Sequence, residues 1–158
     1  MIYLMTVDNG VYYVALGDSL AEGQNPYGKI SYGYADYVAN YLQSSKKLTF
    51  YTKAFAKSGY RTTDLINDIK DNRSVNVEGK KLNIKHALTK ADVITLSIGA
   101  NDLFYKLGVS NIDIIFYNDV DFKKYVDEVI LDIEKLIILI REYCKEDIIL
   151  VGYYNPLW

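Results

Sequence analysis

The apolar residues of this chain come in two patterns, short unbroken runs and longer stretches with helical spacing. The unbroken runs are typical of strands buried on both faces, and they lie at 11–16, 93–98 and 148–151. The β-branched and aromatic segment 48–51 predicts a fourth strand. Helices are predicted between these strands, at 34–42, 62–69, 84–91 and 122–143, and the last of them carries an apolar stripe over about six turns.

Local signals add detail to three of these segments. Thr62-Thr63-Asp64 is typical of an N-cap that opens the helix at 62–69. The polar stretch 71–82 is interpreted as a surface excursion with a turn at Glu78-Gly79-Lys80. In the helix at 34–42 the apolar positions are Tyr34, Val38, Tyr41 and Leu42.

Alternation of strands and helices predicts an α/β fold with right-handed crossovers and a central parallel sheet covered on both faces. Ligands of such sheets bind outside the carboxyl ends of the strands, so the residues just after each strand gather at one edge. Four segments meet this description: Gly17-Asp18-Ser19-Leu20, Ser58-Gly59, Gly99-Ala100-Asn101-Asp102 and Tyr154-Asn155-Pro156. No repeat or linker divides the chain, so we expect a single domain over residues 1–158.

Composition excludes several classes of function. Half of the residues are hydrophobic, 24% are charged and the net charge is −2, which argues against a disordered chain and against nucleic-acid binding. One cysteine, Cys144, and one histidine, His86, exclude a disulfide framework and a metal site rich in these residues. The longest apolar run, 136–140, is far shorter than the ~20 residues that span a bilayer, and residues 1–5 lack the features of a signal peptide. We therefore expect no metal, no cofactor, no nucleic acid and no membrane span. The chain as given shows no export signal, which favours a cytoplasmic location.

The segments after the strands offer one nucleophile and several hydrogen-bond donors. Ser19 follows a buried strand and starts a helix, where free N–H groups and a partial positive charge stabilise an oxyanion. Gly59 allows its N–H to approach a substrate oxygen closely, and Asn101 offers a neutral NH2 donor. The structural alternatives are a helix cap at Ser19, a turn at Gly59 and a loop cap at Asn101. Asp18 and Asp102 are expected to bond backbone N–H groups in their own turns.

Three of these segments resemble the sequence blocks of the GDSL, or SGNH, family of lipases and esterases. Residues 14–23, which contain Gly17-Asp18-Ser19-Leu20, resemble the first block, Ser58-Gly59-Tyr60 the second and Gly99-Ala100-Asn101-Asp102 the third. The blocks come in the family's order, and the resemblance covers nearly the whole chain. The resemblance implies a flavodoxin-like three-layer sandwich with Ser19 as the nucleophile. It also implies an oxyanion hole formed by the N–H groups of Ser19 and Gly59 and by the side chain of Asn101.

One block of that family has no counterpart in the sequence. The family carries an Asp-x-x-His block after a further strand, whereas this sequence ends at Trp158, so we expect the domain to be C-terminally incomplete and its last strand missing. A serine hydroxyl needs an adjacent base. His86 precedes the strand at 93–98 and is expected near the opposite edge, about 20 Å away at ~3.3 Å per strand residue, so it is not predicted to be that base. The unpaired sheet edge predicts self-association.

Two functions follow from the sequence. The first is a serine esterase or acylhydrolase that cleaves a small ester or acylated substrate through an acyl-enzyme at Ser19. The second is a catalytically silent member of the family, or a fragment, that binds a carboxylate or an O-acylated glycan. Nucleotide binding fits the fold but not the first loop, because Gly17-Asp18-Ser19 matches neither the dinucleotide-binding nor the P-loop pattern.

Overall fold

The computed structural model describes residues 10–108 and 119–152. Four parallel strands form the central sheet in the order β2-β1-β5-β6: β1 (Val11–Gly17), β2 (Leu48–Thr52), β5 (Val93–Ser97) and β6 (Asp147–Leu150). The helices are α1 (Ser19–Glu22), α2 (Tyr34–Ser44), α3 (Thr62–Lys70), α4 (Ile84–Lys90), α5 (Ala100–Leu107) and α6 (Asp119–Arg141). The parallel α/β fold predicted from the sequence is confirmed.

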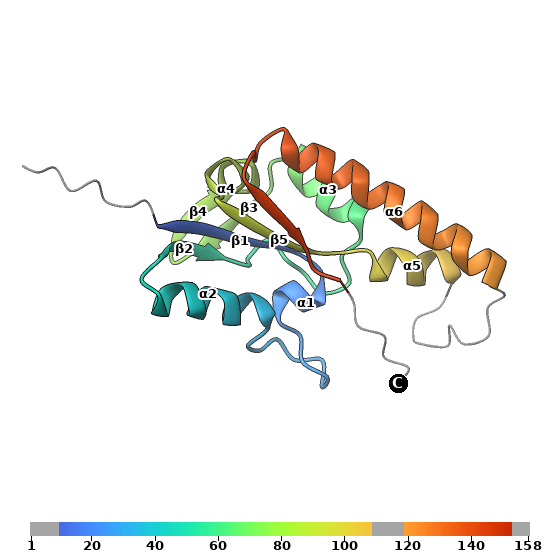
Figure 1. Ribbon diagram of the computed structural model, residues 1–158, viewed down its shortest axis with the longest axis horizontal. Helices are drawn as coiled ribbons and strands as arrows, with labels where there is room; N and C mark the ends of the chain where they lie inside the picture. The colour runs from blue at the N-terminus through green and yellow to red at the C-terminus, as the bar shows by residue number, and fades with distance from the viewer. Residues whose placement is uncertain (1–9, 109–118, 153–158) are drawn as a thin grey trace, which may run out of the picture.

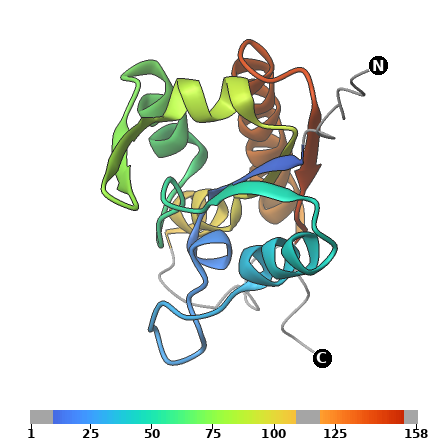
Figure 2. The ribbon, with the colours of Figure 1, turned by 90° about the vertical axis from the view of Figure 1, so that its left-hand side faces the viewer.

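Helices cover both faces of the sheet and make three layers. Figures 1 and 2 show α3, α4 and α6 on one side of the sheet, with α1 and α2 on the other. Successive residues of β1 point to opposite faces, as they must in a strand. Val14 and Leu16 therefore join the larger core under α3, α4 and α6, whereas Tyr13 and Ala15 pack with α2.

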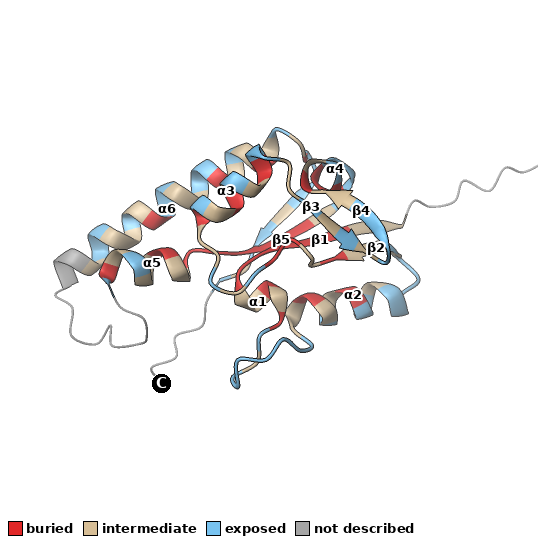
Figure 3. Ribbon diagram, turned by 180° about the vertical axis from the view of Figure 1, so that it is seen from behind, coloured by how far each residue is buried: buried red, intermediate tan, exposed pale blue. Residues whose placement is uncertain are grey.

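The two central strands are the most buried part of the molecule. Tyr13, Val14, Ala15 and Leu16 of β1 have no exposed surface, and β5 is buried along most of its length, as Figure 3 shows in red. The prediction that the run at 11–16 is buried on both faces is confirmed for residues 13–16, whereas Val11 and Tyr12 are partly buried. These strands therefore fix the starting points of the segments that follow their carboxyl ends, α1 after β1 and α5 after β5.

The structure differs from the sequence-based expectation in two segments. The polar stretch 71–82 contains an antiparallel hairpin, β3 (Ser74–Val77) and β4 (Lys80–Asn83), that its weak alternation did not indicate. The predicted turn is present: Glu78 and Gly79 both have positive φ, which is the signature of a two-residue hairpin loop. Helix α5, which begins within the predicted segment 99–102, was not expected, because it is short and starts directly after Gly99, which ends the preceding strand pattern.

Two helices differ in detail from their predicted patterns. The N-cap of α3 is Arg61, not a threonine, and the Asp64 carboxylate accepts from the Arg61 N–H at 2.9 Å. In α2 the buried residues are Ala35 and Ala39, while Tyr41 is 72% exposed. Small alanine side chains bring the helix backbone close to the sheet, and this leaves the bulkier Tyr41 on the solvent side.

Strand β6 is at one edge of the sheet, and its apolar side chains are only partly covered. Ile149 and Leu150 are each about half exposed. An open edge of this kind is the reason that self-association is predicted, and that expectation stays a prediction. Within residues 10–108 and 119–152, no helix is both long and apolar enough to cross a membrane.

Candidate active site

The carboxyl ends of β1 and β5 are in direct contact at the centre of the candidate site. The backbone N–H of Asp18 donates to the carbonyl oxygen of Ser97 at 2.9 Å. Gly17 lies against the same carbonyl: its φ is +127°, and a Cβ atom there would be 1.8 Å from the Ser97 oxygen. Only glycine fits in this position, so β1 delivers Asp18 and Ser19 directly beside the end of β5.

Ser19 is the first residue of α1, and Asp18 is the N-cap of that helix. The Asp18 carboxylate accepts from the Leu20 N–H at 3.1 Å and from the Ser97 hydroxyl at 3.0 Å. The expectation that Asp18 bonds a backbone N–H in its own turn is confirmed, and the capping role considered for Ser19 is wrong. Because α1 has only four residues, the positive charge at its start is smaller than a full-length helix would supply.

Gly59 lies in the loop between β2 and α3, and this loop contacts the first segment at two points. The Lys57 N–H donates to the carbonyl of Gly17 at 3.0 Å. Glu22 of α1 accepts from the N–H of Ser58 at 2.6 Å and from its hydroxyl at 2.5 Å. Gly59 itself is exposed, has a φ of +83° and has open space where a Cβ would lie. The turn therefore requires glycine for its backbone angle and not because a side chain would clash.

Asn101 is the second residue of α5, and its side chain reaches the same loop. Its Nδ2 donates to the carbonyl of Tyr60, the residue after Gly59, at 2.9 Å. This bond fits the alternative of a loop-capping side chain, and the loop that it holds lies 41 positions away in the sequence. An amide NH2 group has two hydrogens, so the other one remains for a further acceptor.

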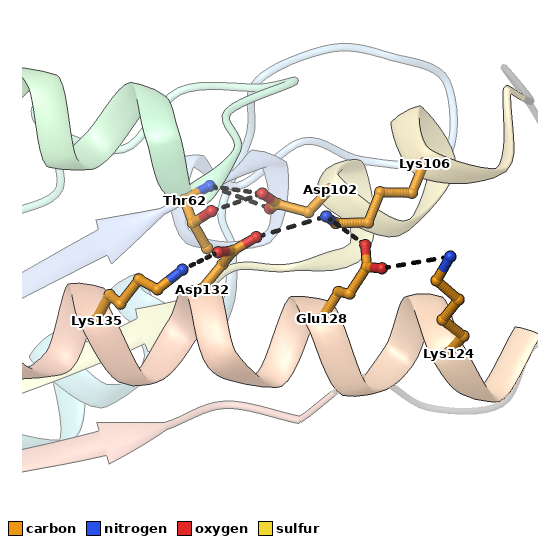
Figure 4. A network of polar contacts seen from close by, with 7 residues as sticks. All are labelled: Thr62, Asp102, Lys106, Lys124, Glu128, Asp132 and Lys135. Atoms are coloured by element: carbon orange, nitrogen blue, oxygen red, sulfur yellow. Dashed lines mark hydrogen bonds and ion pairs between the residues drawn. The ribbon is translucent and has the colours of Figure 1, made fainter.

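Asp102, next to Asn101, holds the first residue of α3. Figure 4 shows its carboxylate accepting from the N–H of Thr62 at 3.0 Å and from the Thr62 hydroxyl at 2.6 Å. The carboxylate also accepts from the N–H of Asp102 itself, so the expectation of a bond within its own turn is confirmed, and the bonds from Thr62, 40 residues away, come in addition. Burial raises the pKa of the Asp102 carboxyl group, and the two bonds from Thr62 oppose that shift.

Ion pairs fix α5 to α6 (Figure 4). The Nζ of Lys106 lies 3.0 Å from a carboxylate oxygen of Glu128 and 3.6 Å from one of Asp132. The hydrogen bond to Glu128 is the main reason that the pKa of Lys106 is raised. Helix α5 is therefore held from two directions, through Asp102 to Thr62 and through Lys106 to α6.

The predicted residues are connected to different degrees. Asn101 is bonded to Tyr60, which directly follows Gly59. Ser19 is linked to the same loop indirectly, through Glu22, which lies three residues later in α1. His86 is exposed on α4, at the end of the sheet opposite α1 and α5 (Figure 1). The fourth predicted segment, 154–156, lies outside the described residues.

Sequence reasoning did not assign Glu22 or Thr62 to the site. For Glu22 a signal existed: it lies three residues after Ser19, a spacing that places both on one helical turn. Its partner Ser58 is 36 positions away, and no pattern in the sequence links the two. The pairing of Thr62 with Asp102 is hidden in the same way.

The groups that follow the carboxyl ends of the strands are one hydroxyl, that of Ser19, and N–H donors from the backbone and from the Asn101 amide. Ser19 is half-buried, and within the described parts of the chain no acceptor takes a hydrogen bond from the N–H of Ser19 or Gly59. Such donors stabilise an oxygen that becomes negatively charged. Residues 10–108 and 119–152 contain no group of three or more His, Cys, Asp or Glu that could hold a metal ion. The arrangement suits acyl transfer.

A comparison with protein families found one match that covers most of the chain. The model of the family described as GDSL-like Lipase/Acylhydrolase matches residues 13–152. That range contains all three sequence blocks and every strand of the central sheet except the first two residues of β1. A search of curated proteins found no match.

Solved structures of similar fold are hydrolases by their titles. The lipase Lip_vut3 from a goat rumen metagenome aligns with a TM-score of 0.63 and 22% identity, over 91% of this chain and 64% of that one. Axe2, an acetylxylan esterase from Geobacillus stearothermophilus, aligns with a TM-score of 0.58 and 21% identity, over 95% of this chain and 63% of that one. Catalytic mutants of Axe2 replace a serine, an aspartate and a histidine by alanine. This chain thus spans slightly less than two thirds of each of these proteins.

Proposed function

The chain belongs to the GDSL-like lipase/acylhydrolase family, and from this premise we propose that it hydrolyses carboxylic esters with Ser19 as the nucleophile. In the proposed reaction the Ser19 oxygen bonds to the ester carbonyl carbon, the bond from that carbon to the alcohol oxygen breaks, and the alcohol leaves with the serine proton. Water then adds to the acyl-enzyme, and the carboxylic acid leaves as the Ser19 hydroxyl is restored.

Three donors are proposed to hold the carbonyl oxygen while it carries negative charge. They are the backbone N–H groups of Ser19 and Gly59 and the free amide hydrogen of Asn101. A donor of this kind typically contributes a factor on the order of 10²–10³ in kcat. We therefore expect Asn101→Ala to retain substrate binding and lose most of the turnover.

The observation that supports this proposal most directly is the bond from Asn101 Nδ2 to the Tyr60 carbonyl at 2.9 Å. It fixes the amide of Asn101 at the residue that follows Gly59. Because one amide hydrogen is bonded to Tyr60, the side chain has a fixed orientation, and so has its second amide hydrogen. Such preorganised donors stabilise a transition state without rearranging.

The proton on Ser19 requires a base, and the proposal does not assign this role to His86. His86 is exposed on α4, at the amino end of β5, whereas Ser19 follows the carboxyl end of β1. The catalytic serine, aspartate and histidine of Axe2 support a serine mechanism for the family fold. The substrate class that we propose is a carboxylic ester of either a lipid or an acylated sugar.

Covalent labelling with a fluorophosphonate tests the nucleophile. We expect the protein to gain one adduct, located by mass spectrometry on the peptide that contains Ser19, and Ser19→Ala to gain none. Ser45→Ala is the matched control, because Ser45 is exposed at the end of α2, just before the amino end of β2, whereas Ser19 follows the carboxyl end of β1. Equal labelling of the wild type and Ser19→Ala would show that Ser19 is not the nucleophile.

A second function, binding without turnover, is favoured by the position of the one histidine, His86, away from Ser19. In that case the donors at Gly59 and Asn101 hold a carboxylate or an acyl group. Hydrolysis of p-nitrophenyl acetate that depends on Ser19 excludes this second function. Acetate binding by calorimetry that weakens in Asn101→Ala, with no turnover and no labelling, selects it.

A further inference from the structure

One carboxylate joins two parts of the site that the proposed reaction needs at a fixed separation. Oε2 of Glu22 accepts both the N–H of Ser58, at 2.6 Å, and the Ser58 hydroxyl, at 2.5 Å. Glu22 ends the helix that Ser19 begins, and Ser58 immediately precedes Gly59. We infer that Glu22 is a positioning residue that sets the distance between the Ser19 hydroxyl and the Gly59 N–H, an inference that rests on the proposed function.

The two bonds are strong and restrict more than distance. Hydrogen bonds to a carboxylate are shorter and roughly twice as strong as those between neutral groups. Here a backbone donor and a side-chain donor of one residue meet one oxygen, which fixes both the position and the rotation of Ser58. Because the next peptide unit contains the N–H of Gly59, its direction follows from that of Ser58.

Packing does not hold Gly59, so its position depends on its neighbours. Gly59 is exposed, and no atom lies within 4 Å of the place where its Cβ would be. On the far side, Tyr60 is held by Asn101. On the near side, the Lys57 N–H donates to the carbonyl of Gly17, and the Lys57 carbonyl accepts from the Tyr60 N–H at 3.1 Å, which closes a turn around Ser58 and Gly59. Among the hydrogen bonds of the described residues, those to Glu22 alone tie Ser58 to the helix that carries Ser19.

Loss of this tie affects the reaction more than substrate binding. A misplacement of about 1 Å in a reacting geometry costs on the order of 10²-fold in rate. Parts of a substrate that do not react keep their contacts when Gly59 shifts. Glu22→Ala is therefore expected to lower kcat and to leave KM within about twofold.

The test measures the second-order rate constant for fluorophosphonate labelling of Ser19, because the phosphoryl oxygen takes the place of the ester carbonyl oxygen. We expect Glu22→Ala to slow labelling by about tenfold to 10²-fold. Glu22→Gln keeps an acceptor oxygen in the same place and is expected to stay within a few fold of the wild type. Asp92→Ala is the matched control, because its carboxylate also accepts from a backbone N–H, that of Tyr12 at 2.7 Å, but at the other end of the sheet.

Hydrogen exchange at the Ser58 amide shows whether the loop itself has changed. We expect faster exchange there in Glu22→Ala, with exchange in β1 and β5 as in the wild type, which also establishes that the variant is folded. Wild-type labelling rates in Glu22→Ala would overturn the inference and leave the proposed function intact, since the bond from Lys57 to Gly17 would then suffice. An equal loss in Glu22→Gln would overturn the hydrogen-bond explanation. Absence of labelling at Ser19 in the wild type would remove the proposed function and this inference together.

Discussion

The two ends of the central sheet are built from different kinds of side chain. The described parts of the chain contain six buried polar or charged residues. Five of them lie at the carboxyl end of a strand or at the start of the helix that follows it: Asp18, Thr52, Thr62, Ser97 and Asp102. The sixth, Thr95, lies within β5. At the amino ends, Asp92 and His86 are exposed and no polar side chain of the described residues is buried.

This difference indicates where the fold tolerates an energetic cost. Burying a polar group is unfavourable unless it is hydrogen-bonded, so each buried group at the carboxyl ends needs a partner. Asp18 bonds Ser97, and Asp102 bonds Thr62. The amino ends need no such partners. Buried and fully paired polar groups hold loops in one arrangement, which a reaction site requires and a surface hairpin does not.

Substitution of glycine is expected to separate the two ends most strongly. Gly17→Ala places a Cβ 1.8 Å from the Ser97 carbonyl oxygen, at a φ of +127°, and is expected to lower the free energy of unfolding by more than about 3 kcal/mol. Gly79→Ala, in the hairpin turn, has a φ of +79° and meets no atom within 4 Å, so only the backbone strain of ~1–2 kcal/mol remains. Urea denaturation measures both values, and equal losses would contradict the close contact between β1 and β5.

Removal of an acid at each end is the next largest effect. Asp102→Ala leaves the buried N–H and hydroxyl of Thr62 without their acceptor and is expected to destabilise the protein by about 2–3 kcal/mol. Asp92→Ala breaks an exposed bond to the Tyr12 N–H, which water replaces, and is expected to cost less than about 1 kcal/mol. Thermal unfolding of the two variants checks the order. A larger loss for Asp92→Ala would contradict the contrast between the two ends.

A pH titration distinguishes two acids near the carboxyl ends and gives the smallest effect. Burial works against ionisation of Asp36, but bonds from Gly33, Lys53 and Tyr51 outweigh it and lower its pKa. A lowered pKa in the folded state means that the stability from Asp36 is fully present above the unfolded pKa of about 3.9 and is lost as the pH falls through the folded pKa. The difference in unfolding free energy between the wild type and Asp36→Asn is therefore expected to shrink as the pH is lowered.

Asp102 provides the opposite sign in the same experiment. Burial raises its pKa in the folded state, so ionisation of Asp102 costs stability as the pH rises from the unfolded pKa through the folded one. The stability of the wild type relative to Asp102→Asn is expected to fall over that interval. Denaturation curves at pH 3 to 7 measure both differences, and slopes of the same sign in the two variants would refute the assignment.

Much of the fold could be predicted from the sequence because its signals are local. The unbroken apolar runs located three strands of the parallel sheet, the β-branched and aromatic segment 48–51 located the fourth, and helical spacing located α2 and α6. The hairpin at 74–83 was not predicted, because a polar strand pair has little alternation of apolar residues. Helix α5 was not predicted, because its eight residues follow a strand and a glycine without a separate cap signal.

The candidate site divides along the same line. The sequence by itself determined which segments follow the carboxyl ends of the strands, since the direction of a parallel strand sends its last residue to a known edge. Only the tertiary structure decided which side chains meet there: Glu22 with Ser58, Asn101 with Tyr60 and Asp102 with Thr62, pairs 36 to 41 residues apart. A hydrogen bond forms within a few tenths of an ångström, and that precision depends on the packing of every element behind the two partners.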